Sequence, residues 1–347
     1  MYHFQNDYNV MCHPAVLKHI TDNMNEHMEG YGNDAACKRA AAHICRACGR
    51  DDLSVHFLSG GTQTNLIVIA AALRPYQAVI AAKTAHISEH ETGAIEATGH
   101  KILELEAVDG KISAAQIEKI ASDHYLSNGP GPEHTPQPKL VYISYSTEMG
   151  TVYSLDELKS IRSVCDKYSL YLYVDGARMG YGLSAADSDV TLVDMAKLCD
   201  AFYIGGTKQG AMYGEAVVIT NPALAVDFRY MIKQRGAMLG KCWLIGLQFE
   251  ALLENDLYFE IAARANRMAD QIRDALLRKG CDIPVKNRTN QVFAVLSDAV
   301  LDALDENFLY TQWCRVDSEH RMVRFCTSWS TSQDDVNALC DAMDELL

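Results

Sequence analysis

Three short polar segments, each following a predicted strand, contain the side chains best suited to chemistry. The first, residues 59–65, reads Ser-Gly-Gly-Thr-Gln-Thr-Asn and opens a predicted helix. Gly60 and Gly61 allow close approach of the backbone, the helix N-terminus offers free N–H groups, and Thr62 adds a hydroxyl. The segment therefore predicts an anion site, most often for phosphate, with a plain helix cap as the alternative interpretation. It matches neither G-x-G-x-x-G nor G-x-x-x-x-G-K-[ST], which disfavours dinucleotide and P-loop sites.

The two other segments supply a carboxylate and an amine. Asp175 ends an apolar strand beside Gly176 and Ala177, whose small side chains leave room next to it; its alternative role is that of a turn residue. Lys208 lies among glycines after another apolar strand, where it can lose its proton and act as a nucleophile. A solvated loop lysine is the alternative interpretation there.

Taken together, the three segments point to one cofactor. A phosphate site, then Asp175, then Lys208 33 residues later (208 − 175), is the order expected of an enzyme that holds pyridoxal phosphate. That cofactor needs an anchored phosphate, a ring nitrogen kept protonated by a carboxylate, and an aldehyde bound to a lysine as an imine. The sequence therefore predicts a pyridoxal-phosphate enzyme.

The elements that must position these residues alternate between β-rich and helical patterns, which predicts an α/β fold with a mostly parallel sheet. The polar segments would then share the C-terminal edge of the sheet, where open α/β sheets bind their ligands. Residues 127–138 hold four of the eight prolines, so we expect an extended surface loop there. Strands are expected at 55–58, 78–82, 101–105, 140–144, 170–174, 202–204 and 216–219, and helices at 62–73, 114–124 and 155–168.

The chain becomes rich in helical patterns after residue 221, and we expect a second, smaller α/β domain beyond this point. Its last helix is expected to start near Ser332, where Asp335 favours a variant of the capping box. We place the boundary near residue 240, which gives a large domain, 1–240, and a small C-terminal domain, 241–347, that also collects the N-terminal segment. The expected elements are a helical stretch at 222–278 and strands at 291–296 and 322–326.

Length and charge exclude several classes of protein. The 347 residues include 31 Lys and Arg against 45 Asp and Glu, a formal net charge of −14. Such an acidic chain repels phosphate backbones and anionic lipid, so we expect neither nucleic acid nor a membrane as a partner. The first residues do not resemble a secretion signal, and no apolar stretch approaches the roughly 20 residues of a transmembrane helix. We therefore expect a cytoplasmic protein.

The eleven cysteines fit no closed disulfide framework, because their number is odd, and we expect them to be reduced. Cys45 and Cys48, with His43 beside them, form a C-x-x-C, but no second pair completes a four-ligand metal site. They lie in an alanine-rich stretch that predicts a helix ending at Gly49. We expect these residues to pack within that helix, and we expect no metal.

Four motifs now carry a resemblance to a known family. They are His86 with Glu91, Val-Asp-Gly-Ala-Arg at 174–178, Gly-Gly-Thr-Lys at 205–208, and Val-Arg-Phe-Cys-Thr-Ser at 323–328. The sequence resembles fold type I pyridoxal-phosphate enzymes of the β-eliminating lyase superfamily, and within it the low-specificity L-threonine aldolases. The resemblance extends from about residue 4 to the C-terminus. It implies a large domain with a seven-stranded, mostly parallel sheet covered by helices, and a small C-terminal α/β domain.

The resemblance implies roles for the cofactor site. Lys208 would bind the cofactor's aldehyde, Asp175 would pair with the pyridinium nitrogen, and His86 would stack on the ring and contact the substrate hydroxyl. Gly61 and Thr62 would hold the phosphate, and Gly60 would hold it more weakly. Thr207 would lie near the phosphate.

The resemblance also implies roles for the substrate site and the assembly. Arg178 would lie near the cofactor's phenolic oxygen or the substrate carboxylate, and Arg324 from the small domain would bind that carboxylate in a bidentate manner. Tyr31 matches a segment that reaches the site of a neighbouring subunit. The family shares its active sites across a dimer and commonly forms homotetramers, so a homodimer or homotetramer is expected.

The sequence departs from the family pattern in three places. Asn6 stands where a serine often helps bind the carboxylate, and an amide can still donate there. Thr147 falls where many members have a histidine proposed to assist deprotonation of the substrate hydroxyl, a task that would pass to His86 or a water. No basic residues align directly with those that neutralise the phosphate from the neighbouring subunit, so Arg235 and Lys241 are the substitutes.

The resemblance therefore implies a small amino acid as substrate and a retro-aldol reaction as the chemistry. L-threonine or L-allo-threonine would be cleaved between Cα and Cβ to glycine and acetaldehyde. A β-eliminating lyase, or another β-hydroxy-amino-acid aldolase, is the alternative on the same residues. A nucleotide-binding regulatory module without chemistry is the alternative from a different class, and it predicts no bound chromophore.

Overall fold

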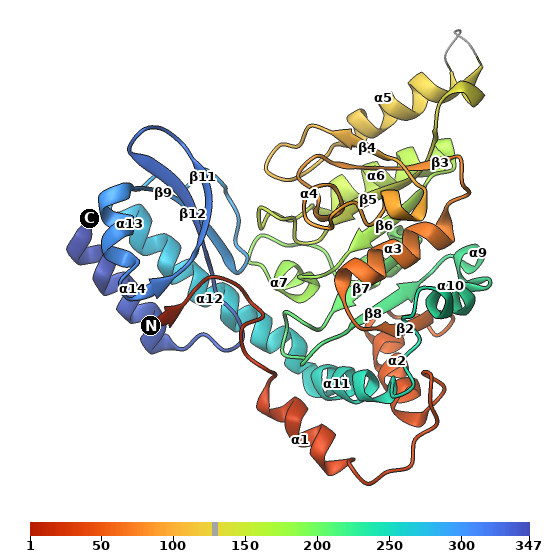
Figure 1. Cartoon of the computed structure of the whole chain (residues 1–347), viewed down its shortest axis with the longest axis horizontal. Coiled ribbons are helices and arrows are strands. Elements are labelled where there is room, and N and C mark those ends of the chain that lie inside the picture. The colour runs from red at the N-terminus through yellow and green to blue at the C-terminus, as the bar shows by residue number, and fades with distance from the viewer. Residues whose placement is uncertain (127–130) are drawn as a thin grey trace.

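The computed structural model of the chain describes residues 1–126 and 131–347. It contains a large unit built on a seven-stranded sheet and a smaller unit built on a three-stranded sheet (Figure 1). The large sheet has the order β2-β8-β7-β6-β5-β3-β4. Its strands are β2 (Ser54–Leu58), β3 (Gln77–Ala82), β4 (Ile102–Leu105), β5 (Gln137–Ser144), β6 (Tyr171–Asp175), β7 (Ala201–Gly205) and β8 (Glu215–Ile219).

Strand directions decide which residues meet at one edge of this sheet. The strands β4, β3, β5, β6 and β7 are parallel neighbours, whereas β8 runs antiparallel to both β7 and β2. β2 therefore ends at the same edge as the parallel strands, and β8 begins there. This edge collects the residues that follow β2, β3, β5, β6 and β7, together with Glu215 at the start of β8.

Helices cover both faces of the large sheet, as the apolar composition of its strands requires (Figure 1). β3, β7 and β8 are buried at every position. α3 packs against β6, β7 and β8, while α5 and α6 pack against β5 and β6. The helices of this part are α1 (Pro14–Asp22), α2 (Ala35–Ala47), α3 (Gly61–Ala72), α4 (His86–Glu89), α5 (Ala114–Tyr125), α6 (Leu155–Tyr168), α7 (Met179–Leu183), α8 (Leu192–Leu198), α9 (Pro222–Ala225), α10 (Phe228–Gln234) and α11 (Trp243–Leu253).

The smaller unit is an antiparallel sheet, in the order β11-β12-β9, with helices beside it. A two-residue parallel pairing of β1 with β10 joins the N-terminus to this unit. The N-terminus accordingly lies beside the C-terminal helices in Figure 1. The elements are β1 (Tyr2–His3), β9 (Gln291–Ser297), β10 (Phe308–Leu309), β11 (Thr311–Arg315), β12 (His320–Cys326), α12 (Leu257–Arg278), α13 (Asp298–Leu304) and α14 (Gln333–Leu346).

The two units have separate apolar cores. The first includes the large sheet and reaches Ile261 in α12, and the second begins with Met268 of the same helix and also contains Phe4. The core thus changes within α12, whose 22 residues run from one unit to the other (Figure 1). The proposed boundary near residue 240 precedes α11, which packs against α1 and α2 of the large unit.

The sequence predicted the elements of the large sheet well. All seven expected strands and the three expected helices are present, with ends that move by up to three residues. The capping box at Ser332 and Asp335 is confirmed, as is the end of α2 at Gly49, which has φ +65°. The expected loop at 127–138 lies partly outside the described residues. The loop ends at residue 136, two residues earlier than expected, because β5 begins at Gln137.

Across residues 1–126 and 131–347, no helix is long and apolar enough to cross a bilayer.

Candidate active site

A cavity of about 640 Å³ opens at the edge of the large sheet where β8 begins, and β11 and β12 of the smaller unit form its opposite wall. This volume lies in the range of small-molecule sites in proteins, about 300–1,000 Å³. Polar side chains from both units face it, so it is suited to a polar ligand. Nine of the fourteen predicted site residues line it: Gly60, Gly61, Thr62, His86, Asp175, Arg178, Thr207, Lys208 and Arg324.

The glycine turn before α3 forms an open cup. Gly60 is the N-cap of the helix, and no side chain within the described chain caps that end. The first-turn N–H groups therefore remain available to an anion, and the helix dipole favours a negative charge there. A Cβ on Gly60 would meet nothing within 4 Å, whereas one on Gly61 would lie 3.2 Å from the Tyr203 hydroxyl. The cup thus has both the donors and the space for a phosphate.

Asp175 is buried at the end of β6 and accepts four hydrogen bonds. The Tyr203 hydroxyl, at 2.5 Å, and the Ala177 N–H, at 2.9 Å, donate to Oδ1. The Tyr142 hydroxyl, at 2.6 Å, and the Asn65 amide, at 2.9 Å, donate to Oδ2. Acceptance from this many donors is characteristic of an ionised carboxylate. Asp175 is therefore held as an anion with a fixed orientation at the cavity wall.

The pKa of Asp175 follows from two opposing effects. Burial alone would raise the pKa, because it disfavours the charged carboxylate. The attraction of His86 whenever its imidazole is protonated, and the hydroxyl hydrogen bonds from Tyr142 and Tyr203, outweigh burial, so the pKa of Asp175 lies below its ordinary value. An anion of this kind can keep a pyridinium nitrogen protonated, which is the role predicted for Asp175.

His86 begins α4 and is coupled to Asp175 through a hydrogen-bond chain. Its Nδ1 lies 2.8 Å from Oε1 of Glu91, and the Asn65 amide donates to that same oxygen at 2.7 Å. Asn65 also donates to Asp175, so it links the two carboxylates. With Glu91 accepting from Nδ1, the Nε2 atom of His86 retains its lone pair for a ligand.

Lys208 faces the cavity from the segment after β7 and is half-buried. Burial and the neighbouring guanidinium of Arg178 lower the pKa of Lys208. The carboxylates of Asp7, Asp175 and Glu215 act in the opposite direction without restoring the ordinary value. A lysine with a lowered pKa is more often uncharged near neutral pH, which a nucleophilic amine requires.

Arg178 has a partner that the sequence interpretation did not include. Its Nε and Nη2 atoms donate to the two oxygens of Asp7 at 2.7 and 3.1 Å, and both residues are largely buried. The Asn290 amide adds a third donor to Asp7 at 3.0 Å. The pair joins the N-terminal segment to β6 and holds Arg178 at the cavity wall. Arg178 is thus positioned by Asp7, and its predicted contacts with cofactor or substrate remain a prediction.

Arg324 reaches the cavity from β12 of the smaller unit. Its Nη1 donates to Gln291 Oε1 at 3.0 Å, and its Nη2 donates to Thr311 Oγ1 at 3.2 Å and to the Gln5 carbonyl at 3.3 Å. The guanidinium also lies 5.5 Å from the centroid of the Trp313 ring. None of these described partners is a carboxylate, so Arg324 can offer its charge to an anionic ligand.

Two predicted substrate contacts lie outside the cavity lining in the described chain. Asn6 uses its Oδ1 to accept the Tyr8 N–H at 3.0 Å. Thr147 is buried, and its hydroxyl is 2.7 Å from that of Thr151. The residues on either side of Thr147, Ser146 and Glu148, line the cavity instead.

Glu148 is a site residue that sequence reasoning missed. Its Oε1 accepts the Ser144 hydroxyl at 2.7 Å and the His86 backbone N–H at 2.9 Å. Burial raises the pKa of Glu148, and these hydrogen bonds only partly offset that effect. The available signal was position alone, because Glu148 follows the predicted strand 140–144 and lies next to Thr147.

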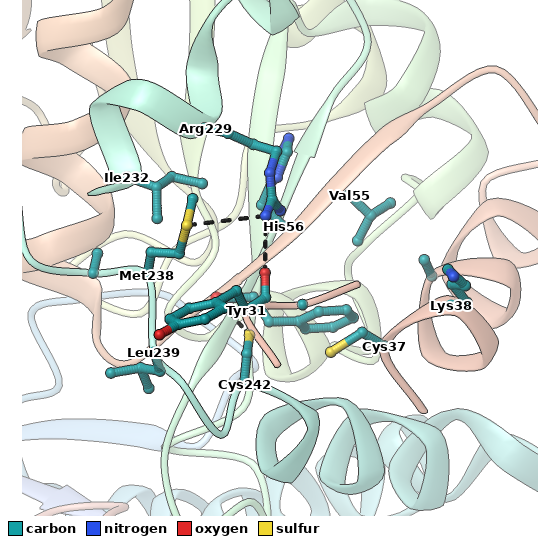
Figure 2. Close-up of a pocket in the computed structure, with 14 residues that line it drawn as sticks. Tyr31, Cys37, Lys38, Val55, His56, Arg229, Ile232, Met238, Leu239 and Cys242 are labelled. Atoms are coloured by element: carbon teal, nitrogen blue, oxygen red, sulfur yellow. Dashed lines mark hydrogen bonds between the residues drawn. The ribbon is translucent and has the colours of Figure 1, made fainter. Parts of the chain in front are cut away.

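Of the three residues predicted to act at a neighbouring subunit, Tyr31 and Lys241 lie close together on another surface, and Arg235 directly follows α10. Tyr31 is 49% exposed, and Arg235 and Lys241 are also exposed. The Tyr31 N–H donates to the Gly240 carbonyl at 3.3 Å, which places Tyr31 next to the segment that contains Lys241. Figure 2 shows Tyr31 at a smaller cavity of about 120 Å³, with its carbonyl accepting from Arg229 at 3.0 Å. None of the three lines the large cavity of this described chain.

The large cavity fits pyridoxal phosphate by the chemistry of its donors. The cup at Gly60 has free N–H groups and open space for the phosphate. Asp175 is a fixed anion that would suit the ring nitrogen, and Lys208 has an amine that would suit the aldehyde. These three functions lie on one cavity wall, as a single bound cofactor requires.

Comparisons with known proteins agree with this site. The family model described as β-eliminating lyase matches residues 12–299. A low-specificity L-threonine aldolase from a Pseudomonas species is 32% identical over 90% of this chain and 88% of its own length. The threonine aldolase of Leishmania major is 42% identical, with a TM-score of 0.96, over 100% of this chain and 99% of that chain. An aspartate aminotransferase from Thermus thermophilus has a TM-score of 0.73 at 14% identity, covering 100% of this chain and 92% of that one, and shows the fold alone.

The shared fold and the three-part cavity place the chain in the fold type I class, whose cofactor is pyridoxal phosphate. The family match extends over most of the sequence, and the Pseudomonas relative supports it. The chain therefore belongs to the β-eliminating lyase family.

Proposed function

We propose that this protein is a threonine aldolase, a carbon–carbon lyase that cleaves L-threonine or L-allo-threonine to glycine and acetaldehyde. The observation that carries the proposal is the meeting of Lys208, Asp175 and the Gly60 cup with Arg324 around one cavity. The names of the Pseudomonas and Leishmania relatives support the same activity.

Arg324 binds the substrate carboxylate in this proposal. Its two Nη atoms are held by uncharged groups of Gln291, Thr311 and Gln5, which fix the plane of the guanidinium without neutralising its charge. Fixing the carboxylate orients the Cα–Cβ bond relative to the cofactor ring. When bound, pyridoxal phosphate supplies the electron-withdrawing ring that accepts the electron pair of that bond.

His86 is the base that takes the proton from the substrate's β-hydroxyl. Glu91 accepts from Nδ1 and thereby keeps Nε2 able to accept a proton. As the hydroxyl loses its proton, the Cα–Cβ bond breaks and acetaldehyde leaves; a proton returned to Cα completes glycine. His86→Ala should lower turnover far more than it weakens cofactor binding, and an equal loss of both would contradict this role.

The experiment for the activity is product analysis. Purified protein loaded with pyridoxal phosphate is incubated separately with L-threonine and L-allo-threonine. Glycine and acetaldehyde in equal amounts are expected, and the two rates rank the diastereomers. Ammonia and 2-oxobutyrate would instead indicate a β-eliminating lyase, the alternative activity on the same scaffold. No turnover from a protein that binds the cofactor would place the substrate among other β-hydroxy amino acids.

We also propose that the protein is a homodimer or homotetramer in the cytoplasm. Tyr31, Arg235 and Lys241 support the assembly, because all three are exposed and none of them lines the cavity of its own described chain. All eleven cysteines are free thiols, which suits a reducing compartment. Sedimentation analysis of wild type and an Arg235→Glu variant tests the assembly, since a monomeric wild type would contradict it.

A further inference from the structure

The carboxyl group of Glu215 lies beside the glycine cup, and neither binding nor catalysis as proposed above uses it. Glu215 begins β8 at the edge where β2 and β7 end. In the sheet it is the register partner of Leu58 and of Gly205. These two residues directly precede the glycine turn at 59–61 and the segment 206–208. Glu215 thus lies between the predicted phosphate cup and the lysine segment.

Both oxygens of Glu215 have partners in that lysine segment. The Thr207 hydroxyl is 2.8 Å from Oε1, and the Gly206 N–H donates to Oε2 at 3.0 Å. The Thr207 oxygen in turn accepts the Gly214 N–H at 3.0 Å. Glu215 is only 4% exposed, and both it and Thr207 line the cavity. The direction of the bond between Thr207 and Glu215 therefore matters to whatever binds there.

Counting protons shows how that direction can change. A threonine hydroxyl has one proton and two lone pairs, and the Gly214 N–H occupies one lone pair. When Glu215 is ionised, the Thr207 proton must point to Oε1, and only a lone pair is left for the cavity. When Oε1 carries a proton, the carboxyl donates to Thr207, and the Thr207 proton is free to donate into the cavity.

We propose that Glu215 is a positioning residue for the cofactor phosphate: in its protonated form it turns the Thr207 hydroxyl into a phosphate donor. The proposal rests on pyridoxal phosphate being the cofactor. A phosphate dianion is bound by hydrogen-bond donors and repelled by a carboxylate. Protonation of Glu215 frees the Thr207 donor and removes the negative charge, so the bound dianion favours the protonated form.

The surroundings of Glu215 make this protonation accessible near neutral pH. Burial raises the pKa of Glu215 to about 7, against the opposing effects of the Thr207 and Gly206 hydrogen bonds and the Lys208 charge. The Asp175 carboxylate adds to the rise. Three buried phenols also face this group, and because the pKa of each lies well above 10 they stay neutral: Tyr173, Tyr203 and Tyr258.

The test measures binding of 4-deoxypyridoxine 5′-phosphate to the apoprotein by calorimetry, because this analogue has no aldehyde to react with Lys208. If only protonated Glu215 supports tight binding, wild-type affinity falls about 20-fold between pH 6.5 and pH 8.5. Glu215→Gln offers an amide donor to Thr207 at every pH, so its affinity stays flat over this range. Glu148→Gln, which removes another buried carboxyl of the same cavity, should retain the wild-type fall.

A second measurement uses the wild-type protein alone. Titrations at pH 8 in two buffers of different ionisation enthalpy should show uptake of nearly one proton on binding. A fall in Glu215→Gln equal to that of wild type, or no proton uptake at pH 8, would overturn the proposal. Failure of wild type to bind the analogue would remove the cofactor assignment and this proposal together. Intact pH-dependent binding without cleavage of threonine would refute only the aldolase activity.

Discussion

Tyr203→Phe removes one hydroxyl that donates to Asp175 and leaves the packing of the ring in place. The hydroxyl lies 2.5 Å from Oδ1, and Tyr203 is 1% exposed. A hydrogen bond to a charged group contributes about 1.5–3 kcal/mol, and water cannot readily replace it at a buried site. We therefore expect the free energy of unfolding of the apoprotein to fall by about 1.5–3 kcal/mol at pH 7.

Tyr173→Phe is the matched control. Tyr173 is equally buried in the same sheet, but its hydroxyl donates to the Asn65 amide oxygen at 2.9 Å and not to the carboxylate. A hydrogen bond between neutral groups contributes about 0.5–1.5 kcal/mol, so this variant should lose less stability. The difference between the two variants isolates the charge of Asp175.

The assay is urea unfolding of both apoprotein variants at pH 7 and near pH 3, which lies below the unfolded pKa of an aspartate, about 3.9. The pKa of Asp175 is lowered in the folded state, so its stabilising effect is present above the unfolded pKa, about 3.9, and is lost as the pH falls below it. The difference between the losses of unfolding free energy in Tyr203→Phe and in Tyr173→Phe should therefore be smaller at the lower pH. An equal cost for the two variants at pH 7 would refute the account of Asp175 as a buried anion.

Three further predictions concern the substrate, the cup and acid stability. Arg324→Lys should lower kcat/KM for threonine by about 10- to 100-fold through loss of the bidentate contact, while Arg321→Lys on the same strand, whose partner is Asp298, should have little effect in the same kinetic assay. Gly60→Ala should leave the urea midpoint of the apoprotein unchanged, because the added Cβ meets no atom within 4 Å. The same variant should bind 4-deoxypyridoxine 5′-phosphate about tenfold more weakly, because the methyl group enters the cup, and unchanged affinity would place the phosphate elsewhere. Burial lowers the pKa of His56 to about 4, so folding stability is lost as the pH falls from about 6.5 toward 4. In urea unfolding at these two pH values, His56→Gln should remove about 3 kcal/mol of that loss, and an unchanged loss would contradict the role of His56.

The sheet was predictable from sequence because its strands are short apolar runs separated by clear helix patterns. β7 and β8 are buried at all positions, so their composition alone marks them as central strands. The sequence did not predict that α12 leaves one apolar core and enters the other, because the amphipathic pattern of this long helix continues without a break between Ile261 and Met268. β1 and β10 were also missed, since a two-residue pairing leaves no periodic signal.

The site was predictable where a residue's role depends on its own strand end, as for Asp175 and Lys208. It was not predictable where the role depends on distant partners. Arg178 meets Asp7, 171 positions earlier in the chain, and no local pattern records that ion pair. Glu148 was missed for a different reason: in the turn after β5, adjacent side chains face opposite ways, and the neighbouring Thr147 was the one considered.

We propose that Lys208 binds pyridoxal phosphate in the cavity at the edge of the large sheet. This assignment is tested most directly by loading the protein with the cofactor, reducing it with borohydride and mapping the modified peptide by mass spectrometry. We expect one pyridoxyl-modified residue, Lys208, and loss of the modification when 4-deoxypyridoxine 5′-phosphate is added in excess beforehand. Modification of a different lysine, or none in a correctly folded protein, would contradict it.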